Sequence, residues 1–418
     1  SASAAWRISD EQFFKNVKEL SFINDMKIRA SYGVTGNFEI GNYDHLATMS
    51  IDNYILGNGL AYGYKPDNIK RDDLSWEKNQ MINAGIDLQM FDGYIGFSVD
   101  YYNTNTSNML LYVPVPLLTG YSTSLQNIGK VNNRGWELAL TSQHTFANGF
   151  GYSFNANYAK NTNEVKELGP GNASIISTGS VNHAFYKTEV GKPIGNYYLL
   201  VQDGIFATAE DLKKYPHFDN TEVGDFRFVD VDGDGKLDLD KDRTICGNYM
   251  PKFTYGFGGK LWYAGFDMDF NFQGVYGNKI LNLNKRYLDN MEGNTNGTKI
   301  ALDRWRSPEN PGSGSVNKAN RKQTGYNSRT STWHLESGSY LRLQNLSLGY
   351  TLPRALTQKF KVEKLRVYVS GQNLFTITDY SGYNPEVNAR PSQNLTPGED
   401  YGTYPLARTY MFGLNLTL

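Results

Sequence analysis

The sequence predicts an all-β protein, an antiparallel transmembrane β-barrel or a part of one. Apolar and polar residues alternate with a period of two over runs longer than the roughly five or six residues of an average globular strand. Short turns and long polar segments follow each other along the chain, which is the arrangement of outer-membrane barrels. Glycine and aromatic residues are abundant, with 42 Gly, 30 Tyr and 22 Phe among 418 residues.

The clearest predicted hairpin spans residues 82–102. The apolar face of its first strand consists of Ile82, Ala84, Ile86, Leu88 and Met90, opposite Asn83, Gly85, Asp87 and Gln89. Asp92-Gly93 follows at once, and this dipeptide favours a tight hairpin because both central positions of the turn need positive φ. The return strand places Ile95, Phe97, Val99 and Tyr101 on one face.

The same alternation predicts further strands. They lie around residues 136–140, 152–158, 253–261, 266–272, 346–352, 365–369 and 410–418, with weaker candidates at 1–8, 26–33, 45–55 and 185–200. Tight turns at Asn148-Gly149 and Tyr263-Ala264-Gly265 join two of these pairs. We therefore expect about thirteen strands.

Alternation alone also fits a soluble β-sandwich, which has one apolar and one polar face as well. Two features favour the barrel. Long polar segments at 34–74, 165–184, 279–331 and 378–404 contrast with the short turns, as outer loops contrast with periplasmic turns. Aromatic residues gather near strand ends in the manner of an interfacial girdle, at Trp76, Tyr94, Tyr101, Trp136, Tyr158, Trp262 and Tyr263.

The composition excludes several classes of protein. Lys and Arg number 41 and Asp and Glu 42, so no field of a single sign would attract a nucleic acid. Cys246 is the single cysteine, so we expect no internal disulfide and interpret the residue as inert. Mean hydropathy is −0.52, and no run approaches the roughly 18 apolar residues of a membrane-spanning helix. A barrel strand crosses with about 9–11 residues, only every second one apolar.

The sharpest local motif runs from Asp230 to Asp238, with the sequence DVDGDGKLD. Carboxylates at the first, third, fifth and ninth places, with glycine at the sixth, match a calcium loop of the EF-hand type. Lys241 stands where the bidentate glutamate is expected, and the neighbouring Asp242 is the candidate substitute. The sequence thus predicts a structural Ca²⁺ site formed by Asp230, Asp232, Asp234, Lys236, Asp238 and Asp242. The alternative is an acidic surface turn without metal.

Other patterns do not indicate catalysis. The run Gly256–Lys260 superficially suggests a phosphate loop, but it lies inside an alternating strand. The histidines at 45, 144, 183, 217 and 334 form no ligand pattern. Asp267 and Asp269 share a strand face, which would suit a glycosidase pair, although we favour a solvated lumen lining. We expect no enzymatic activity.

Several runs resemble one family. They are Lys27–Asn37, Val190–Gly195, Asp242–Ile245 with Gly247-Asn248, Pro251–Phe257, Tyr340–Tyr350 and Asp400–Pro405, and together they span almost the entire chain. In combination they are similar to the SusC-like (starch-utilisation-system type, RagA-like) TonB-linked outer-membrane transporters. The last residue departs from the pattern, because members usually end on phenylalanine and this chain ends on Leu418.

The resemblance implies a plugged barrel of about 22 strands in the cell outer membrane, in contact with its lipid. It implies import of glycan or peptide fragments, energy supplied through TonB, and a SusD-like surface lipoprotein as lid. Residues 1–418 would then be the C-terminal part of one barrel domain, with the plug and the N-terminal strands absent from the chain. The alternative function is a secreted carbohydrate-binding β-sheet protein, and a glycosidase is the weaker third. Stacking aromatics such as Tyr121, Tyr326 and Tyr383 fit sugars, peptides or loop packing alike.

Overall fold

The computed structural model describes residues 1–418 except 38–42, 44, 122, 182, 293–294 and 322–325. Parts of the predicted loops at 34–74, 165–184 and 279–331 therefore lie outside the described residues. The chain divides into two compact units, one formed by residues 1–141, 159–176 and 188–194, the other by residues 142–158, 177–187 and 195–418.

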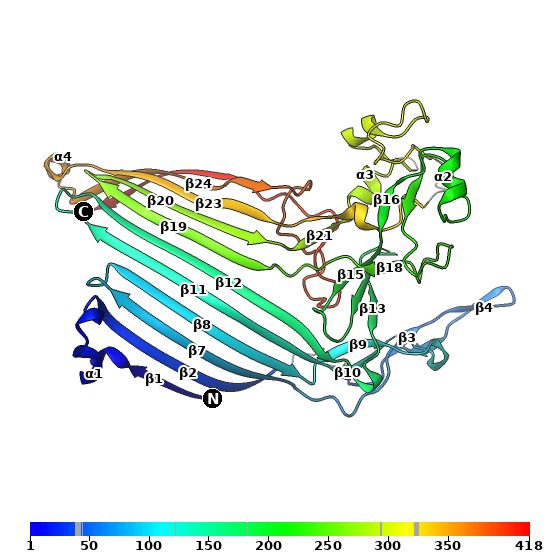
Figure 1. The fold of residues 1–418 in the computed structure, drawn as a ribbon, viewed down its shortest axis with the longest axis horizontal. Coiled ribbons are helices and arrows are strands. Elements are labelled where there is room, and N and C mark those ends of the chain that lie inside the picture. The colour runs from blue at the N-terminus through cyan, green and yellow to red at the C-terminus, as the bar shows by residue number, and fades with distance from the viewer. Residues whose placement is uncertain (38–42, 44, 122, 182, 293–294, 322–325) are drawn as a thin grey trace. The chain divides into compact units, whose positions relative to one another are not determined.

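The largest sheet among the described residues has eleven strands (Figure 1). In sheet order they are β1 (Ala2–Arg7), β2 (Ile23–Asn37), β7 (Glu77–Met90), β8 (Ile95–Ser107), β11 (Lys130–Thr145), β12 (Gly151–Glu167), β19 (Phe253–Tyr263), β20 (Phe266–Tyr276), β23 (Tyr340–Thr351), β24 (Lys364–Thr378) and β26 (Thr409–Thr417). The sheet order follows the chain, as in an up-and-down barrel. Seven of its neighbouring pairs are antiparallel along most of their length, and three of these seven contain a register shift.

The tight turns form as the sequence predicts. Asp92 and Gly93 adopt φ values of 54° and 83°, and Ala264 and Gly265 adopt 49° and 86°. Gly149 also has a positive φ, of 84°. Left-handed backbone at both central positions matches the twist of the flanking strands, so these residues close the hairpins with the shortest connections.

The long connections contain smaller sheets and short helices. Their strands are β3 (Met49–Ile51), β4 (Tyr54–Leu56), β5 (Gly59–Ala61), β6 (Tyr64–Pro66), β9 (Leu110–Pro114), β10 (Thr123–Asn127), β13 (Ile175–Thr178), β14 (Phe185–Thr188), β15 (Asn196–Leu200), β16 (Gln202–Ile205), β17 (Phe226–Phe228), β18 (Arg243–Ile245), β21 (Lys279–Asn282), β22 (Leu335–Ser337) and β25 (Glu399–Asp400). The α-helices are α1 (Gln12–Lys15), α2 (Ala209–Lys214), α3 (Lys285–Leu288) and α4 (Arg354–Thr357). Short 3-10 helices are η1 (Ile8–Asp10), η2 (Lys18–Leu20), η3 (Leu117–Thr119), η4 (Pro170–Asn172), η5 (Lys299–Asp303), η6 (Thr332–His334) and η7 (Gln358–Phe360). None of the described helices is long and apolar enough to cross a membrane.

The second unit has its core in these connections. One cluster of buried side chains consists of Val181, Ala184, Tyr186, Tyr197, Leu199, Leu281 and Leu283. Another consists of Leu200, Ile205, Phe218, Phe226 and Phe228. In contrast, apolar side chains on the long strands are exposed to the surroundings, for example Phe412 at 83% and Leu414 at 65%. The connections therefore pack like a soluble domain, while the sheet presents an apolar surface.

The all-β class and the hairpins are confirmed, but the strand count needs a correction. The large sheet holds eleven strands among the described residues, against about thirteen expected. The weak candidates at 1–8 and 26–33 belong to it as β1 and β2. Those at 45–55 and 185–200 form the small strands β3, β4, β14 and β15 inside long connections. Alternation marks any half-buried strand, so it does not separate strands of the large sheet from strands of its loops.

Gly265 allows a test of the turn between β19 and β20. A Cβ there would lie 2.7 Å from the carbonyl oxygen of Thr351, whereas one at Gly149, at nearly the same φ, would meet nothing within 4 Å. We expect Gly149→Ala to lower the free energy of unfolding by about 1–2 kcal/mol, because both turns need left-handed backbone. Gly265→Ala should cost roughly 1–3 kcal/mol more because of the clash. Urea unfolding of the full-length protein in detergent measures both, and equal losses would contradict this account of the turn.

Candidate functional site

The polar face of the large sheet carries a paired charge cluster in the first unit. Arg29 of β2 donates to both carboxylate oxygens of Asp87 at 2.9 and 3.0 Å and to both of Asp100 at 2.6 Å. Lys27 lies 3.0 Å from the same Asp87 carboxylate. Two cations therefore face two anions, and the geometry of Arg29 is bidentate on both sides.

Along the strands of the large sheet, the apolar face carries aromatic side chains and, further along, amide side chains. Tyr101 and Trp136 pack with ring centroids 4.8 Å apart. Further along the same face of β8, Asn103 and Asn105 accept hydrogen bonds of 2.5 and 2.8 Å from the amide of Asn132. The change from aromatic to amide side chains is what a strand shows where it leaves hydrocarbon and enters water. This pattern supports the predicted girdle at Tyr101 and Trp136.

A β-bulge in β23 reorients its first residues. Phe272 pairs with Leu343 and Asn271 with Asn345, so Gln344 is the extra residue. Without the bulge, strict alternation would put Arg342 on the apolar face with Leu346 and Leu348. Arg342 instead lies opposite Gln273 on β20 and opposite Thr376 on β24, on the polar face. Bulges re-aim side chains in this way.

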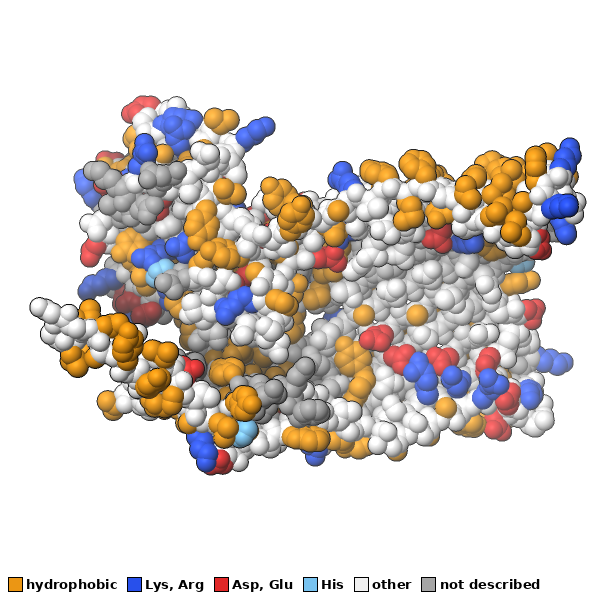
Figure 2. Space-filling model, turned by 180° about the vertical axis from the view of Figure 1, so that it is seen from behind, with side chains coloured by type: hydrophobic (Ala, Val, Ile, Leu, Met, Phe, Trp, Pro, Cys, Tyr) orange, Lys and Arg blue, Asp and Glu red, His pale blue; other side chains and the backbone are white. Residues whose placement is uncertain are grey.

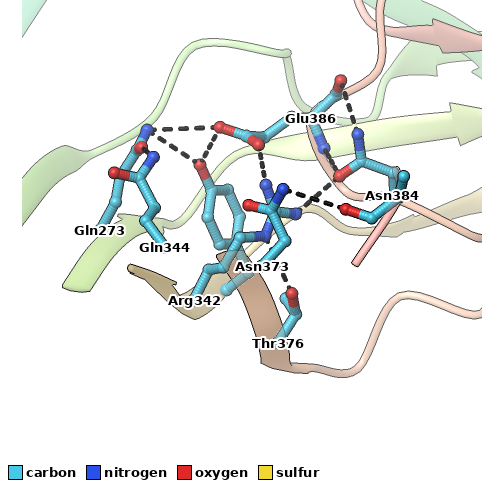
Figure 3. Close-up of polar contacts among 9 residues, drawn as sticks. Gln273, Arg342, Gln344, Asn373, Thr376, Asn384 and Glu386 are labelled. Carbon is cyan, nitrogen blue, oxygen red and sulfur yellow. Dashed lines mark hydrogen bonds and ion pairs between the residues drawn. The ribbon is translucent and has the colours of Figure 1, made fainter. Parts of the chain in front are cut away.

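Arg342 is the centre of a polar network that joins strands to a loop (Figure 3). Its guanidinium contacts the Glu386 carboxylate and donates to Asn384 at 2.7 Å and to Thr376 at 2.9 Å. Tyr340 donates to Glu386 at 2.5 Å. Glu386 and Asn384 come from the connection between β24 and β26, so this network fixes that connection over the polar face.

A recess lies on the polar face beside the network. Its volume is about 280 Å³, and its lining includes Asn157, Tyr255, Asn271, Gln273 and Gln344. Gln344, the bulged residue, donates to the amide oxygen of Gln273. The amide groups offer both donors and acceptors, which suits a polar oligomer such as a sugar chain or a peptide backbone. This recess is the candidate site for substrate contact.

Buried polar contacts hold the long connections of the second unit together. The Glu399 carboxylate is fully buried and accepts from the amide of Ser180 at 2.9 Å and from the hydroxyl of Tyr186 at 3.1 Å. Tyr197 donates to the carbonyl oxygen of Gly398 at 2.9 Å. Burial raises the pKa of the Tyr186 and Tyr197 hydroxyls well above the usual value, so both remain donors. Segments more than 200 residues apart in sequence are thereby fixed to each other.

The acidic loop brings three carboxylates close together. Ligand oxygens of Asp230, Asp232 and Asp234 lie within 4.8 Å of one another. Asp230 accepts from the amides of Gly233 and Gly235 at 2.7 and 2.8 Å. These hydrogen bonds wrap the backbone around the first carboxylate and turn the next two towards it.

The remaining predicted ligands are placed differently. Asp242 is fully buried and accepts from the amides of Val231 at 2.8 Å and Asp238 at 2.6 Å, so it closes the two ends of the loop. Asp238 accepts from Asp240, and this backbone hydrogen bond lowers its pKa. Lys236 donates its amide to Asp234 at 2.9 Å. The structure thus brings together three of the six predicted residues as potential ligands and uses Asp242 as a brace.

The remaining candidate groups lack the surroundings of catalytic residues. Both carboxylate oxygens of Asp267 are occupied by Arg366 at 2.8 and 2.6 Å, as expected of a lumen lining. Burial raises the pKa of the Cys246 thiol to about 11, so it stays protonated. Burial lowers the pKa of His334 to about 3, which keeps this ring neutral. Tyr326 stacks on Phe218 at 4.2 Å within the loop core, and so serves loop packing.

With this geometry established, comparisons with known proteins decide the family. The family model described as TonB dependent receptor-like, beta-barrel, matches residues 1–374. The chain belongs to this family. Its members are outer-membrane proteins, so the predicted location is confirmed and the apolar face of the large sheet is the face towards lipid.

Named relatives of this receptor-like barrel confirm the SusC and RagA resemblance. TonB-dependent receptor P3 of Formosa agariphila is 34% identical over 428 residues, which cover 100% of this chain and 41% of that protein. TonB-dependent receptor SusC of Bacteroides thetaiotaomicron is 28% identical, covering 100% and 39%. The structure of the RagAB peptide transporter matches with a TM-score of 0.79 at 27% identity, covering 99% and 42%. The chain spans about two fifths of the length of these relatives.

Sequence reasoning did not find the Glu386 network or the recess. Glu386 lies in a long connection with no periodic pattern, and Arg342 reads as an outlier on an apolar face until the bulge is known. The one available signal was a basic residue that strict alternation places on the same face as Leu346 and Leu348. It indicates an irregularity because an unpaired charge does not face lipid.

We expect Glu386→Gln to loosen the connection between β24 and β26. The Arg342 side chain is only 3% exposed and would lose the Glu386 carboxylate as its partner, whereas Glu386 itself is 35% exposed. The free energy of local unfolding should therefore fall by about 1–3 kcal/mol. Hydrogen exchange of residues 379–400 in the full-length protein measures this loss. Glu363→Gln, at an exposed turn, is the matched control. Identical exchange in both variants would mean that the network does not hold the loop.

Proposed function

We propose that the complete protein imports oligomeric nutrients, glycans or peptides, across the outer membrane with energy supplied through TonB. The observation that carries this proposal is the alignment of the entire chain with transporter relatives of the SusC and RagA type. The polar recess beside the Glu386 network supports it, because an imported oligomer needs hydrogen-bonding groups along its path. The plug and the segment that contacts TonB would be supplied by parts of the protein outside residues 1–418.

A SusD-like surface lipoprotein is the partner we propose for the long connections. The hairpin formed by β4 and β5 supports it, because Tyr54 and Ile55 are each 71% exposed and Leu56 is 66% exposed. Such an apolar hairpin in a long connection would gain free energy from burial against a second protein. The substrate class stays open between glycans and peptides, since amide side chains bind both.

We also propose that the acidic loop binds Ca²⁺ in a structural role. Three carboxylates offer hard oxygen ligands at mutual distances that suit one cation, and Asp242 keeps the loop closed by its backbone hydrogen bonds. Bound calcium would neutralise the repulsion among these carboxylates and stiffen residues 230–242.

The partner proposal can be tested by purification. Full-length protein taken from native membranes in mild detergent should retain a surface lipoprotein. Ile55→Asp with Leu56→Asp should reduce its recovery roughly 10-fold or more, because charges replace apolar contacts of the hairpin. Leu302→Asp, at a leucine 72% exposed in another connection, is the control. Absence of any lipoprotein from the unaltered complex would refute the partner, and uptake measured in liposomes would then judge transport separately.

The calcium proposal has its own test. We expect the full-length protein to bind about one calcium ion in the acidic loop, and Asp232→Asn with Asp234→Asn to abolish that binding. Calcium should slow hydrogen exchange in residues 225–245 of the unaltered protein and should not do so in the double variant. Asp219→Asn, at an exposed aspartate outside the loop, should change neither result. Metal content below stoichiometric together with calcium-independent exchange would refute the site.

A further inference from the structure

An apolar groove lies on the lipid-facing side of the second unit, near the short turns. Its volume is about 680 Å³, and its lining includes Tyr263, Phe266, Leu348, Tyr350, Val367 and Phe412. These residues come from β19, β20, β23, β24 and β26. In β23, Tyr350 lies near the turn and Leu348 lies two residues further from it. The groove therefore extends about 7 Å or more along the strands, away from the turns. That depth and an apolar lining suit the first part of an acyl chain.

The turn between β23 and β24 adds cations beside this groove. α4 and η7 follow each other directly and contain the apolar residues Leu356 and Phe360. They are 50% and 80% exposed. Apolar groups this exposed on a membrane protein gain free energy in the interfacial layer of the leaflet.

Arg354, Lys359 and Lys361 surround these two apolar residues in the sequence. None of the three forms an ion pair with any residue that the structure describes. In Figure 2, hydrophobic side chains gather at the upper right, at the end of the sheet where Figure 1 places α4, and Lys and Arg side chains border them. A cationic margin thus adjoins an apolar surface.

We propose that this turn and groove form a binding site for an anionic phospholipid. The phosphate of the lipid would contact Arg354, Lys359 and Lys361, Phe360 and Leu356 would enter the interfacial layer, and an acyl chain would lie in the groove. The site would serve as an anchor at the leaflet on the side of the short turns, which is the periplasmic side in outer-membrane barrels.

Charge complementarity selects this occupant over others. A neutral bilayer would satisfy the groove and Phe360 but would leave three cations without partners. A soluble phosphate would satisfy the cations but not the apolar lining. An anionic phospholipid satisfies both, and each Lys or Arg near an anionic surface contributes about 1 kcal/mol to binding.

Native mass spectrometry of the full-length protein tests the site. Phosphatidylglycerol and phosphatidylcholine with the same acyl chains are added separately to the protein in detergent. We expect a clear preference for phosphatidylglycerol. Replacement of the three cations, R354Q/K359Q/K361Q, should lower phosphatidylglycerol affinity on the order of 100-fold and remove the preference.

Two further variants separate the parts of the site. K213Q/K214Q/K299Q removes the same charge from exposed positions in long connections and should leave the preference intact. Leu348→Trp should narrow the groove and weaken binding of both lipids about equally. Equal binding of the two lipids by the unaltered protein, or an unchanged preference in R354Q/K359Q/K361Q, would overturn the proposal. Heat-modifiability on gels confirms that each variant is folded.

Discussion

Hydrocarbon offers no water to a peptide group, so each N–H and C=O of a strand that crosses a bilayer needs a partner in the neighbouring strand. This constraint explains most of the large sheet. Its strands reach 17 residues, its registers run without interruption through pairs such as β19 and β20, and its shortest turns use left-handed residues that keep both strands paired to their ends. The register shifts at Gln344 in β23, and between Ile23 and Asp25 at the start of β2. Both irregularities lie within a few residues of a strand end, and the registers between them are regular.

The two faces of the sheet follow from the same constraint. One face meets lipid and carries exposed apolar side chains such as Phe266 and Phe412. The other face carries charges, but these occur in compensated groups, as Arg29 with two aspartates and Arg366 with Asp267 show. Such pairing keeps the polar face ordered without a strong net field, which agrees with the overall charge of −1. The polar face is therefore hydrophilic and yet nearly neutral.

Periodicity was sufficient to predict the hairpins, because a period of two and an Asp-Gly turn are local properties of the chain. It was not sufficient at Arg342, because a bulge depends on how two neighbouring strands pair and has no signature in one strand alone. It was also insufficient in the long connections, where Glu399 meets Ser180 across more than 200 residues. The acidic loop contains both a feature that the sequence predicts and a feature that only the structure reveals. Its spacing predicted that Asp230, Asp232 and Asp234 converge, whereas the bracing role of Asp242 depends on the tertiary position of two backbone amides.

The strands and the long connections of the second unit are therefore stabilised in different surroundings. The strands are held by backbone hydrogen bonds in lipid, and the long connections are held by a core of residues such as Tyr197 and Leu281 that excludes water. Each part has its own source of stability, so a change in one need not disturb the other. What joins them are a few polar contacts at the strand ends, above all Arg342 with Glu386. Such contacts fix the position of a loop relative to the ends of the strands. The recess borders this junction, because Gln273 lines the recess and also donates to Glu386.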